Sequence, residues 1–386
     1  MKDKLRNFTP VLLFSLLPTI LVWIPFYLRL DQFWTIPLPK QGMETIVANY
    51  DGPLFLVVAK TLYNPELINQ QFQFSLPDIY YSAHYPLFPL LIRLVGLVIN
   101  YPYAMLIVTL ISSIVATNYF RKLVSMYVDK KHINWMLLVF SILPARWLIV
   151  RSVGSAEPLF IASIIASLYY FVNKKYIPAA FWGVLAQLTK SPGILLFISY
   201  FFAVLFPSLK NVAFSSLSEW FNKLNIRKTW PIILIPISLL GLFYFYGVRY
   251  GDFYAYFNSG DNIHLFFPPF QIFNYSAPWV GTFWLEEIIF VYLIGSLGFL
   301  KLVEKKLYPF AWFVGIYFFS ILFVSHRDII RYTLPIVPFL LIGWCDLISK
   351  RHFKIAFAVI IIPVYLFSLS YISQNVMPIS DWAPFL

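Results

Sequence analysis

Long apolar segments that carry almost no charge recur along this 386-residue chain, and they constrain its fold more than any other feature. The clearest are 11–28, 230–248 and 355–372. A run of about 18 or more such residues spans the ~30 Å hydrocarbon core of a bilayer. Because backbone groups in lipid must pair within their own segment, these runs are expected to be helices. The composition agrees, since a soluble domain of this size needs more charged surface than 12% charged residues provide.

The predicted fold is an all-α polytopic membrane protein with about 11 transmembrane helices, forming one integral membrane domain over 1–386. The expected spans lie near 9–28, 103–121, 133–150, 157–173, 178–190, 192–207, 230–248, 282–300, 308–325, 333–349 and 355–373. The first follows a short basic stretch, Met1-Lys-Asp-Lys-Leu-Arg, as in a signal peptide. It is too long for one and lacks a small-residue cleavage site, so it is interpreted as an uncleaved first helix.

The distribution of charge predicts which side of the membrane each loop faces. If segment 84–99 lies at the interface, 19 of the 29 Lys and Arg residues but only 5 of the 17 acidic residues fall in cytoplasmic segments, including the N-terminus. The alternative, a transmembrane 84–99, would place the basic groups at 121–131 and 174–175 outside, against the positive-inside rule. The net charge of +12 therefore reflects topology and does not indicate a nucleic-acid partner.

This topology leaves two long external loops, 29–102 and 249–281, and the first is expected to contain interfacial helices. A helical bundle needs only short connections, so loops of this length are usually functional. The single cysteine, Cys345, excludes a disulfide framework and a multi-cysteine metal site within this sequence. Candidate chemistry is therefore sought among the acidic, basic and histidine residues of the outer side.

The first external loop holds two candidate residues. Asn49-Tyr50-Asp51-Gly52-Pro53 places Asp51 at the start of a helix, because proline is favoured in the first helical turn. Asp51 is then either an ordinary N-cap or a general base at the membrane surface. His84 lies in a proline-rich run and faces the outer compartment, although a lone histidine is more often a hydrogen-bonded structural residue.

A second group of candidates consists of charged residues within or near the expected helices: Arg146, Arg151, Glu157, Lys190, Arg249, Arg327, Asp328 and Arg331. Charges at this depth usually face a cavity or a partner. Arg327 and Arg331 are four residues apart and would share one face of a helix, where two guanidinium groups suit a phosphate or diphosphate. Ion pairing with Asp328 or Glu157 is the alternative for the same two arginines.

The second external loop contains Gly251-Asp252-Phe253 and Asp261-Asn262-Ile263-His264. A carboxylate and an imidazole can bind a divalent cation, but this spacing matches no strong metal motif. No residue is therefore assigned to a metal, and no cofactor is predicted beyond a divalent cation as an open alternative.

Taken together, these segments resemble the PIG-V-like mannosyltransferases of the membrane-embedded glycosyltransferase class called GT-C. The resemblance rests on six segments in order along most of the chain: Tyr50-Asp51-Gly52 with Phe55, Leu56 and Ala59; His84 to Arg93; Leu143-Pro144 to Phe160; Leu188 to Gly193; Gly251-Asp252-Phe253; and Arg331-Tyr332 with Pro335 and Pro338. The chain departs from the family pattern where Tyr50 replaces tryptophan and Lys190 replaces arginine.

The resemblance implies inverting transfer of a hexose, with mannose as first candidate, from a polyprenyl- or dolichyl-phosphate donor. The acceptor would be a glycan, glycolipid or protein outside the cytoplasm, and Asp51 would be the general base. The implied contacts are Lys190, Arg327 and Arg331 for the donor phosphate and His84, Glu157, Arg151 and Asp252 for the substrates. The expected location is a prokaryotic plasma membrane with the active site facing outside, rather than the endoplasmic reticulum.

A secondary transporter or lipid-flippase-like protein is the main alternative, because transporters also carry intramembrane charges and broken helices, such as the one expected near Pro192. Transporters usually show internal repeats and charges at the midplane. Here no repeat is found in the sequence, and the charges gather towards one face. A non-catalytic subunit that binds lipid-linked glycan is a further alternative, and it predicts that Asp51→Asn leaves function unchanged.

Overall fold

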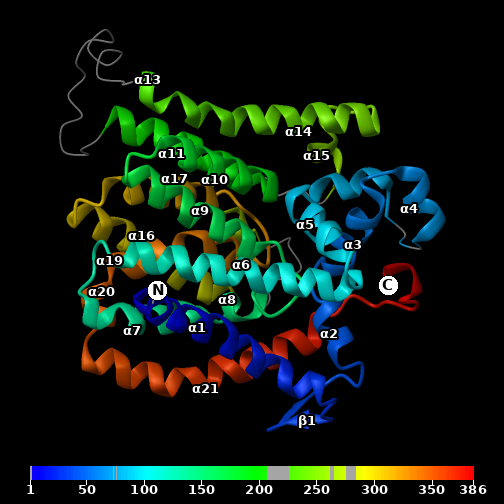
Figure 1. Ribbon diagram of the computed structural model, residues 1–386, viewed down its shortest axis with the longest axis horizontal. Helices are drawn as coiled ribbons and strands as arrows, with labels where there is room; N and C mark the ends of the chain where they lie inside the picture. The colour runs from blue at the N-terminus through cyan, green and yellow to red at the C-terminus, as the bar shows by residue number, and fades with distance from the viewer. Residues whose placement is uncertain (1, 73, 75, 207–225, 261–264, 275–283) are drawn as a thin grey trace.

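The computed structural model of the chain describes residues 2–72, 74, 76–206, 226–260, 265–274 and 284–386. The chain forms a bundle of helices that lie roughly side by side (Figure 1). The strands in this described part form one short hairpin, in which β1 (Gln32–Phe33) pairs antiparallel with β2 (Ile36–Pro37). The all-α prediction is therefore confirmed.

Within the described residues, four helical segments are long and apolar enough to cross a membrane, judged by length and composition. They are α1 (Lys2–Tyr27), α6 (Tyr101–Val124), α14 (Leu234–Tyr250) with the preceding turn η4 (Trp230–Ile233), and α21 (Arg351–Gln374). Large apolar side chains stay exposed along them, including Leu17, Ile237 and Val359. Exposed apolar surface of this kind is expected where helices face lipid.

The other expected spans are also helical where the structure describes them, but most are short or broken. They are α7 (Ile133–Ile142), α8 (Ala145–Val150), α9 (Glu157–Val172), α10 (Tyr176–Thr189), α11 (Ile194–Leu205), α16 (Trp284–Glu304), α17 (Tyr308–Ile321), α18 (Ile329–Tyr332), α19 (Val337–Gly343) and α20 (Cys345–Ile348). Pro144 separates α7 from α8, and Pro192 lies in the turn η3 (Ser191–Gly193) between α10 and α11, because proline has no N–H to continue a helix. The break expected near Pro192 is present. The count of about 11 crossings stays a prediction.

The interior of the bundle is built around α9, which packs against α6 and α10. Every residue from Glu157 to Leu168 is buried, and small side chains such as Ser163 and Ala166 let the neighbouring helices approach closely. Glu157, the first residue of α9, begins this buried stretch, so its side chain lies inside the bundle rather than on its surface. A carboxylate in this position needs charged or hydrogen-bonding partners.

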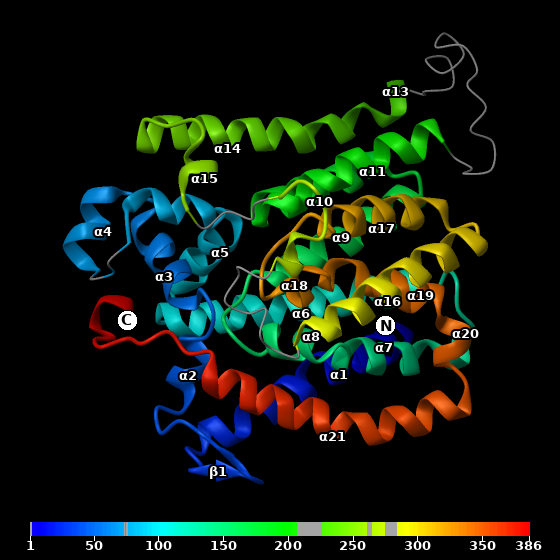
Figure 2. The ribbon, with the colours of Figure 1, turned by 180° about the vertical axis from the view of Figure 1, so that it is seen from behind.

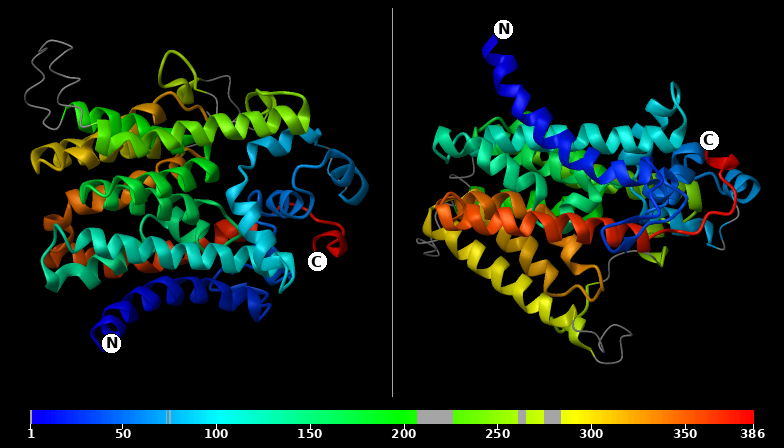
Figure 3. Two further views of the ribbon diagram at one scale, coloured as in Figure 1. Left: turned by 45° about the horizontal axis from the view of Figure 1, so that its top comes forward. Right: turned by 90° about the horizontal axis from the view of Figure 1, so that it is seen from below.

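One end of the bundle collects the short elements of the first expected external loop (Figures 1 and 2). They are α2 (Met43–Val47), α3 (Gly52–Thr61), α4 (Pro65–Gln71), the turn η1 (Asp78–Ala83) and α5 (Leu87–Gly96), with α15 (Ala255–Asn258) from the second expected loop at the same end. The last residues of the chain return to this end (Figure 3). Both α13 (Ile226–Thr229) and α20 lie at the opposite end.

Segment 84–99 contains α5, whose ten residues correspond to ~15 Å, about half of a bilayer core. That length favours the interfacial placement over a crossing. Arg93 on α5 donates from Nη1 to the carbonyl oxygens of Ala59 and Lys60, each over 2.9 Å. It thereby satisfies carbonyl groups that the end of α3 leaves unpaired.

Candidate active site

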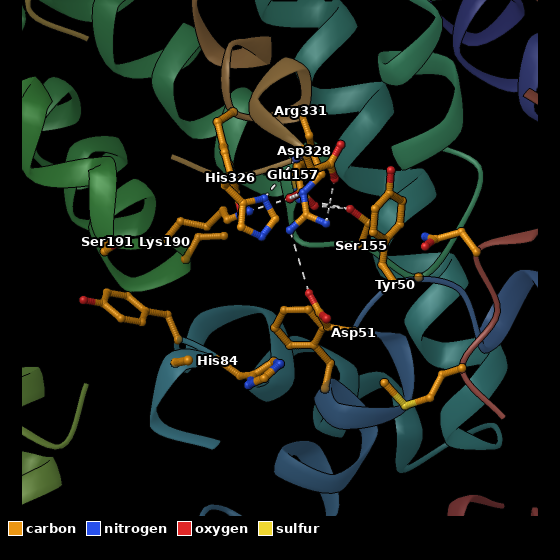
Figure 4. A pocket seen from close by; sticks show the side chains of 18 of the residues that line it. Tyr50, Asp51, His84, Ser155, Glu157, Lys190, Ser191, His326, Asp328 and Arg331 are labelled. Carbon is orange, nitrogen blue, oxygen red and sulfur yellow. Dashed lines mark hydrogen bonds and ion pairs between the residues drawn. The ribbon is translucent and has the colours of Figure 1, made fainter. Parts of the chain in front are cut away.

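A cavity of about 430 Å³ lies beside α3, within the common size range of small-molecule sites, about 300–1,000 Å³. Segments far apart in the sequence line it: the α2–α3 turn, the residues after η1, the α8–α9 turn, the end of α10 with η3, the α17–α18 loop and the end of α21. Asp51 and His84 lie on one side (Figure 4). The opposite side carries the charged residues Lys190, Glu157, Asp328 and Arg331.

Asp51 occupies the N-cap position of α3, but its side chain caps no described backbone group. The carboxylate points into the cavity, with 37% of the side chain exposed and Oδ2 3.8 Å from Arg331 Nη2. The turn before it is sharp, because Tyr50 has a left-handed φ of 50° and a Cβ added to Gly52 would lie 2.3 Å from the Val47 carbonyl oxygen. Asp51 is therefore a cavity-facing carboxylate rather than a capping one.

Glu157 joins two basic residues on the opposite wall. Its Oε1 contacts Lys190 Nζ and lies 3.0 Å from Arg331 Nε, while its Oε2 accepts a hydrogen bond from the Ser155 hydroxyl. Both oxygens of this buried carboxylate are thus engaged. Glu157 holds Lys190 and Arg331 next to each other, and two adjacent cationic donors suit an anion that presents several oxygens.

Asp328 and Arg146 extend this network behind Arg331. Asp328 Oδ2 lies 3.5 Å from Arg331 Nη1, and Oδ1 lies 3.3 Å from Arg146 Nη2. Arg146 Nη1 donates to the Tyr50 hydroxyl over 3.0 Å, and its guanidinium lies 3.9 Å from the centre of the Tyr371 ring. Ion pairing of Arg331 with Asp328 or Glu157 is the alternative expected from the sequence, and both pairs are present. The sequence indicates Arg146 only as a charge near the helices and does not place it beside the site. Because an unpaired charge in a membrane is costly, the sequence could have indicated that Arg146 also needs a partner of opposite charge.

His84 is 3% exposed and lines the cavity, yet neither ring nitrogen has a hydrogen-bond partner among the described residues. Burial lowers the pKa of His84 to about 4, so the ring is neutral near pH 7. A buried polar group without a partner costs roughly 1–3 kcal/mol, which a ligand hydroxyl would offset.

Arg327 also lines the cavity, from the loop between α17 and α18. Because α18 begins at Ile329, Arg327 and Arg331 do not share a helix face, and that expectation is wrong. In the same loop His326 accepts a hydrogen bond at Nδ1 from the Asp328 backbone N–H over 3.0 Å, and burial lowers the pKa of His326. The loop thus contributes a cation and an imidazole to the cavity.

Arg151 and Asp252, both predicted to contact substrate, lie outside the described lining of the cavity. Arg151 is wholly buried where α1, α7 and α8 meet, with backbone carbonyl oxygens around its guanidinium. Asp252 accepts hydrogen bonds from the Tyr254 N–H and the Asn258 amide, and so stabilises the start of α15. His264, the other candidate cation ligand of that loop, lies outside the described residues.

An apolar groove of about 400 Å³ adjoins the charged cavity, and the two share Tyr85, Ser191, Tyr256 and Tyr332 in their lining. The Tyr256 hydroxyl donates to Ser191 Oγ over 2.7 Å where they meet. Beyond that point the groove is lined mainly by apolar side chains of α11, α14 and α17, including Leu195, Phe243 and Ile321. The cavity therefore has a charged part and an apolar extension, which the sequence did not reveal.

No protein-family model matches the chain, and no curated protein matches it. Among solved structures, it is similar to the oligosaccharyltransferase of Archaeoglobus fulgidus, determined as a complex with Zn and sulfate. The match has a TM-score of 0.54 at 15% identity and covers 96% of this chain but 54% of the other, so this chain spans about half of that protein's length. At this identity the likeness shows a shared fold, and it does not extend to the PIG-V-like subtype.

The matched structure was determined with zinc, so a divalent cation is a candidate ligand for this cavity. Within the described residues, no group of three or more His, Cys, Asp or Glu side chains is placed to hold a metal ion. The carboxylates of Asp51, Glu157 and Asp328 each form an ion pair with a Lys or Arg side chain. A divalent cation needs several oxygen ligands and would have to displace these positive groups, so the residues present do not fit one.

Proposed function

We propose that this chain is a glycosyltransferase that moves a hexose, with mannose as first candidate, from a polyprenyl- or dolichyl-phosphate donor to an extracytoplasmic glycan, glycolipid or protein. The observation that carries the proposal is the position of Asp51, which faces Lys190 and Arg331 across a cavity that continues into an apolar groove. The GT-C-like fold and the long apolar helices support it. The proposed location is a prokaryotic plasma membrane, with the cavity on its outer side.

The proposed donor is amphipathic, and the two connected hollows suit its two parts. The prenyl chain matches the apolar groove, and the phosphate matches the cations at its inner end. The cavity lining carries three cations, Lys190, Arg327 and Arg331, and three carboxylates, Asp51, Glu157 and Asp328, while Arg146 pairs with Asp328 from outside that lining. The lining cations suit a phosphate, because guanidinium and ammonium groups donate charge-assisted hydrogen bonds to phosphate oxygens.

In the proposed reaction, the Asp51 carboxylate takes the proton of the acceptor hydroxyl as its oxygen attacks the anomeric carbon. The bond between that carbon and the phosphate oxygen breaks, and the lipid phosphate leaves with the electron pair. Lys190 and Arg331 stabilise its negative charge, because fixed cations cost no reorganisation as the charge develops. Attack from the side opposite the leaving phosphate inverts the configuration of the sugar carbon.

The roles expected for His84 and Glu157 are refined by their surroundings. Neutral His84 lines the cavity and is suited to hydrogen bonding with a sugar hydroxyl, because an uncharged imidazole has both a donor and an acceptor nitrogen. Glu157 has both oxygens engaged by Lys190, Arg331 and Ser155. We therefore assign Glu157 to positioning the two cations rather than to binding a sugar hydroxyl.

The proposal is tested with the purified chain in liposomes and polyprenyl-phosphate [¹⁴C]mannose as donor. The expected result is release of lipid phosphate and labelling of an added glycoside, both lost in Asp51→Asn while donor binding is retained. The matched control is Asp252→Asn, which removes a nearby carboxylate that lies outside the described cavity lining and should keep full activity. Unchanged turnover in Asp51→Asn would remove that residue from the mechanism. Movement of lipid or solute across the bilayer with no sugar transfer would favour the transporter or flippase alternative.

A further inference from the structure

The side of the cavity next to the apolar groove differs in chemistry from the side formed by the C-terminal part of the chain. The side shared with the apolar groove carries Ser191 and adjoins Lys190, and it lies opposite the C-terminal part of the chain, whose ribbon passes near Tyr50 (Figure 4). From that part, the cavity lining includes Tyr371, Gln374, Asn375, Val376 and Met377. None of these side chains carries a formal charge. The side opposite the proposed donor is thus neutral, with amide groups and an aromatic ring.

Asn49 connects this neutral side, through hydrogen bonds, to the turn that carries Asp51. Asn49 is 0% exposed, and its Nδ2 donates to the Ile372 carbonyl oxygen over 2.8 Å. Its Oδ1 accepts from Asn375 Nδ2 over 3.2 Å, and its backbone forms a bridge with Val376. Since Asn49 lies two residues before Asp51, the position of residues 372–376 is fixed relative to the proposed base.

The chain beyond this point is also anchored on α3. Lys60 Nζ donates to the carbonyl oxygen of Pro384 over 2.7 Å and to the Leu386 oxygen over 2.6 Å. The Phe385 ring is buried, with its centre 5.1 Å from that of Phe72. We call residues 375–386 the strap, because they run across the same end of the bundle as α3, and their first three residues line one side of the cavity.

On the basis of the proposed function, we propose that Gln374 and Asn375 form the acceptor subsite and select an uncharged polyhydroxyl acceptor. Asn49 is the positioning residue that fixes this subsite relative to Asp51. An amide offers both a donor and an acceptor of hydrogen bonds, as a sugar hydroxyl requires. A charged acceptor would lose hydration at this subsite, and the two amides that would bind it carry no counter-charge. The donor enters from the groove on the other side, so the two substrates approach Asp51 from opposite walls.

The test uses methyl α-D-mannoside as neutral acceptor and its 6-phosphate as charged acceptor, with polyprenyl-phosphate mannose as donor. In Gln374→Ala, the KM for methyl α-D-mannoside should rise about fivefold, the size expected for one lost hydrogen bond. Hydrolysis of the donor by water and the donor KM should stay within about twofold, because the donor side is untouched. The 6-phosphate should be the poorer acceptor of the wild type. Asp381→Asn is the control on the neighbouring strap, since its carboxylate accepts from the Ala383 N–H outside the cavity lining.

Asn49→Ala supplies a readout that does not need turnover. Loss of its two side-chain hydrogen bonds should increase amide hydrogen exchange at residues 375–377 and raise the acceptor KM without changing donor hydrolysis. Unchanged acceptor kinetics in Gln374→Ala, or equal use of the 6-phosphate, would overturn the acceptor subsite while leaving the transferase proposal standing. If the wild type turns over no donor at all, the proposed function fails, and saturation-transfer NMR of methyl α-D-mannoside on wild type and Gln374→Ala still decides whether the subsite binds a neutral sugar.

Discussion

The Arg331 side chain is 13% exposed and Arg151 is 0% exposed, and the surroundings of the two residues are of opposite kinds. Arg331 borders the open cavity and pairs with the carboxylates of Glu157 and Asp328. Arg151 lies at the junction of α1, α7 and α8, and the partners described for its guanidinium are backbone carbonyl oxygens. In the sequence the two residues look alike, since each is a charge near the end of an apolar run. The difference lies in what surrounds each guanidinium, and it separates a candidate ligand-binding cation from a structural one.

The carbonyl partners of Arg151 are oxygens that helix breaks leave free. The Phe14 carbonyl in α1 would normally accept a hydrogen bond from the N–H of residue 18, but residue 18 is proline, and the Phe14 carbonyl accepts from Arg151 Nη2 over 3.2 Å instead. Ser141 lies in the last turn of α7, which ends at Ile142, and its carbonyl accepts from Arg151 Nη1 over 2.9 Å. Arg151 therefore repairs two gaps in the backbone ladder. Arg331, beside open space, can exchange a contact for a ligand oxygen.

The largest effect is expected for Arg331→Gln. The change removes a fixed positive charge from the site where the lipid phosphate would leave, so turnover should fall by about 10²–10³. The measurement is release of polyprenyl phosphate from labelled donor by the reconstituted protein. Full activity in Arg331→Gln would show that the ion pairs of Arg331 are as structural as the contacts of Arg151, and the contrast between the two would disappear.

Arg151→Met should have the opposite profile. It leaves the Phe14 and Ser141 carbonyls without their donor, and at roughly 1–3 kcal/mol for each buried unsatisfied group the folded state should lose about 2–6 kcal/mol. The melting temperature in detergent should drop, while activity per folded molecule stays near that of the wild type. A variant that melts normally but has lost turnover would place Arg151 back among the substrate-binding residues.

An intermediate effect is expected from pH. The folded pKa of His84, about 4, lies below the ordinary value of 6.5, because burial disfavours the charged ring despite Asp51 nearby, and Lys190 and Arg331 lower the pKa further. Between these values the unfolded chain binds a proton that the folded chain does not, so stability is lost as pH falls from about 6.5 to about 4. In His84→Gln this part of the acid destabilisation should vanish. Equal slopes of melting temperature against pH in wild type and variant would contradict it.

How far the sequence predicts this arrangement depends on whether the signal is local. The helices follow from apolar runs and the breaks from proline, and Gly52-Pro53 was enough to place Asp51 at the start of α3. The cavity residues near α3, α9 and α10 were also named in advance from the family resemblance. Each of these signals is contained in a segment of a few neighbouring residues.

The misses depend on tertiary packing. The position of Arg151 outside the described cavity lining was not predicted, because the sequence does not reveal which broken helices meet at a buried junction. Asp252 looked like a loop carboxylate facing solvent or substrate, whereas its oxygens are used by α15. Gln374 and Asn375 went unnoticed because neutral amides after a helix resemble any surface loop. The apolar groove arises only where α11, α14 and α17 come together, so no single segment predicts it.

The smallest effect is expected from removing divalent cations. This experiment also tests whether Arg331 differs in role from Arg151. If Lys190 and Arg331 supply the positive charge at the leaving phosphate, the cavity carboxylates are already neutralised by protein cations. Turnover of the wild type after EDTA treatment and gel filtration should then stay within about twofold of the untreated protein, because no stabilising charge is lost. Equilibrium dialysis with Mn²⁺ should show no stoichiometric binding to the wild type. Loss of activity that Mn²⁺ specifically restores would mean that a metal replaces one of these ion pairs in the working state, and Arg331 would then be a structural cation like Arg151.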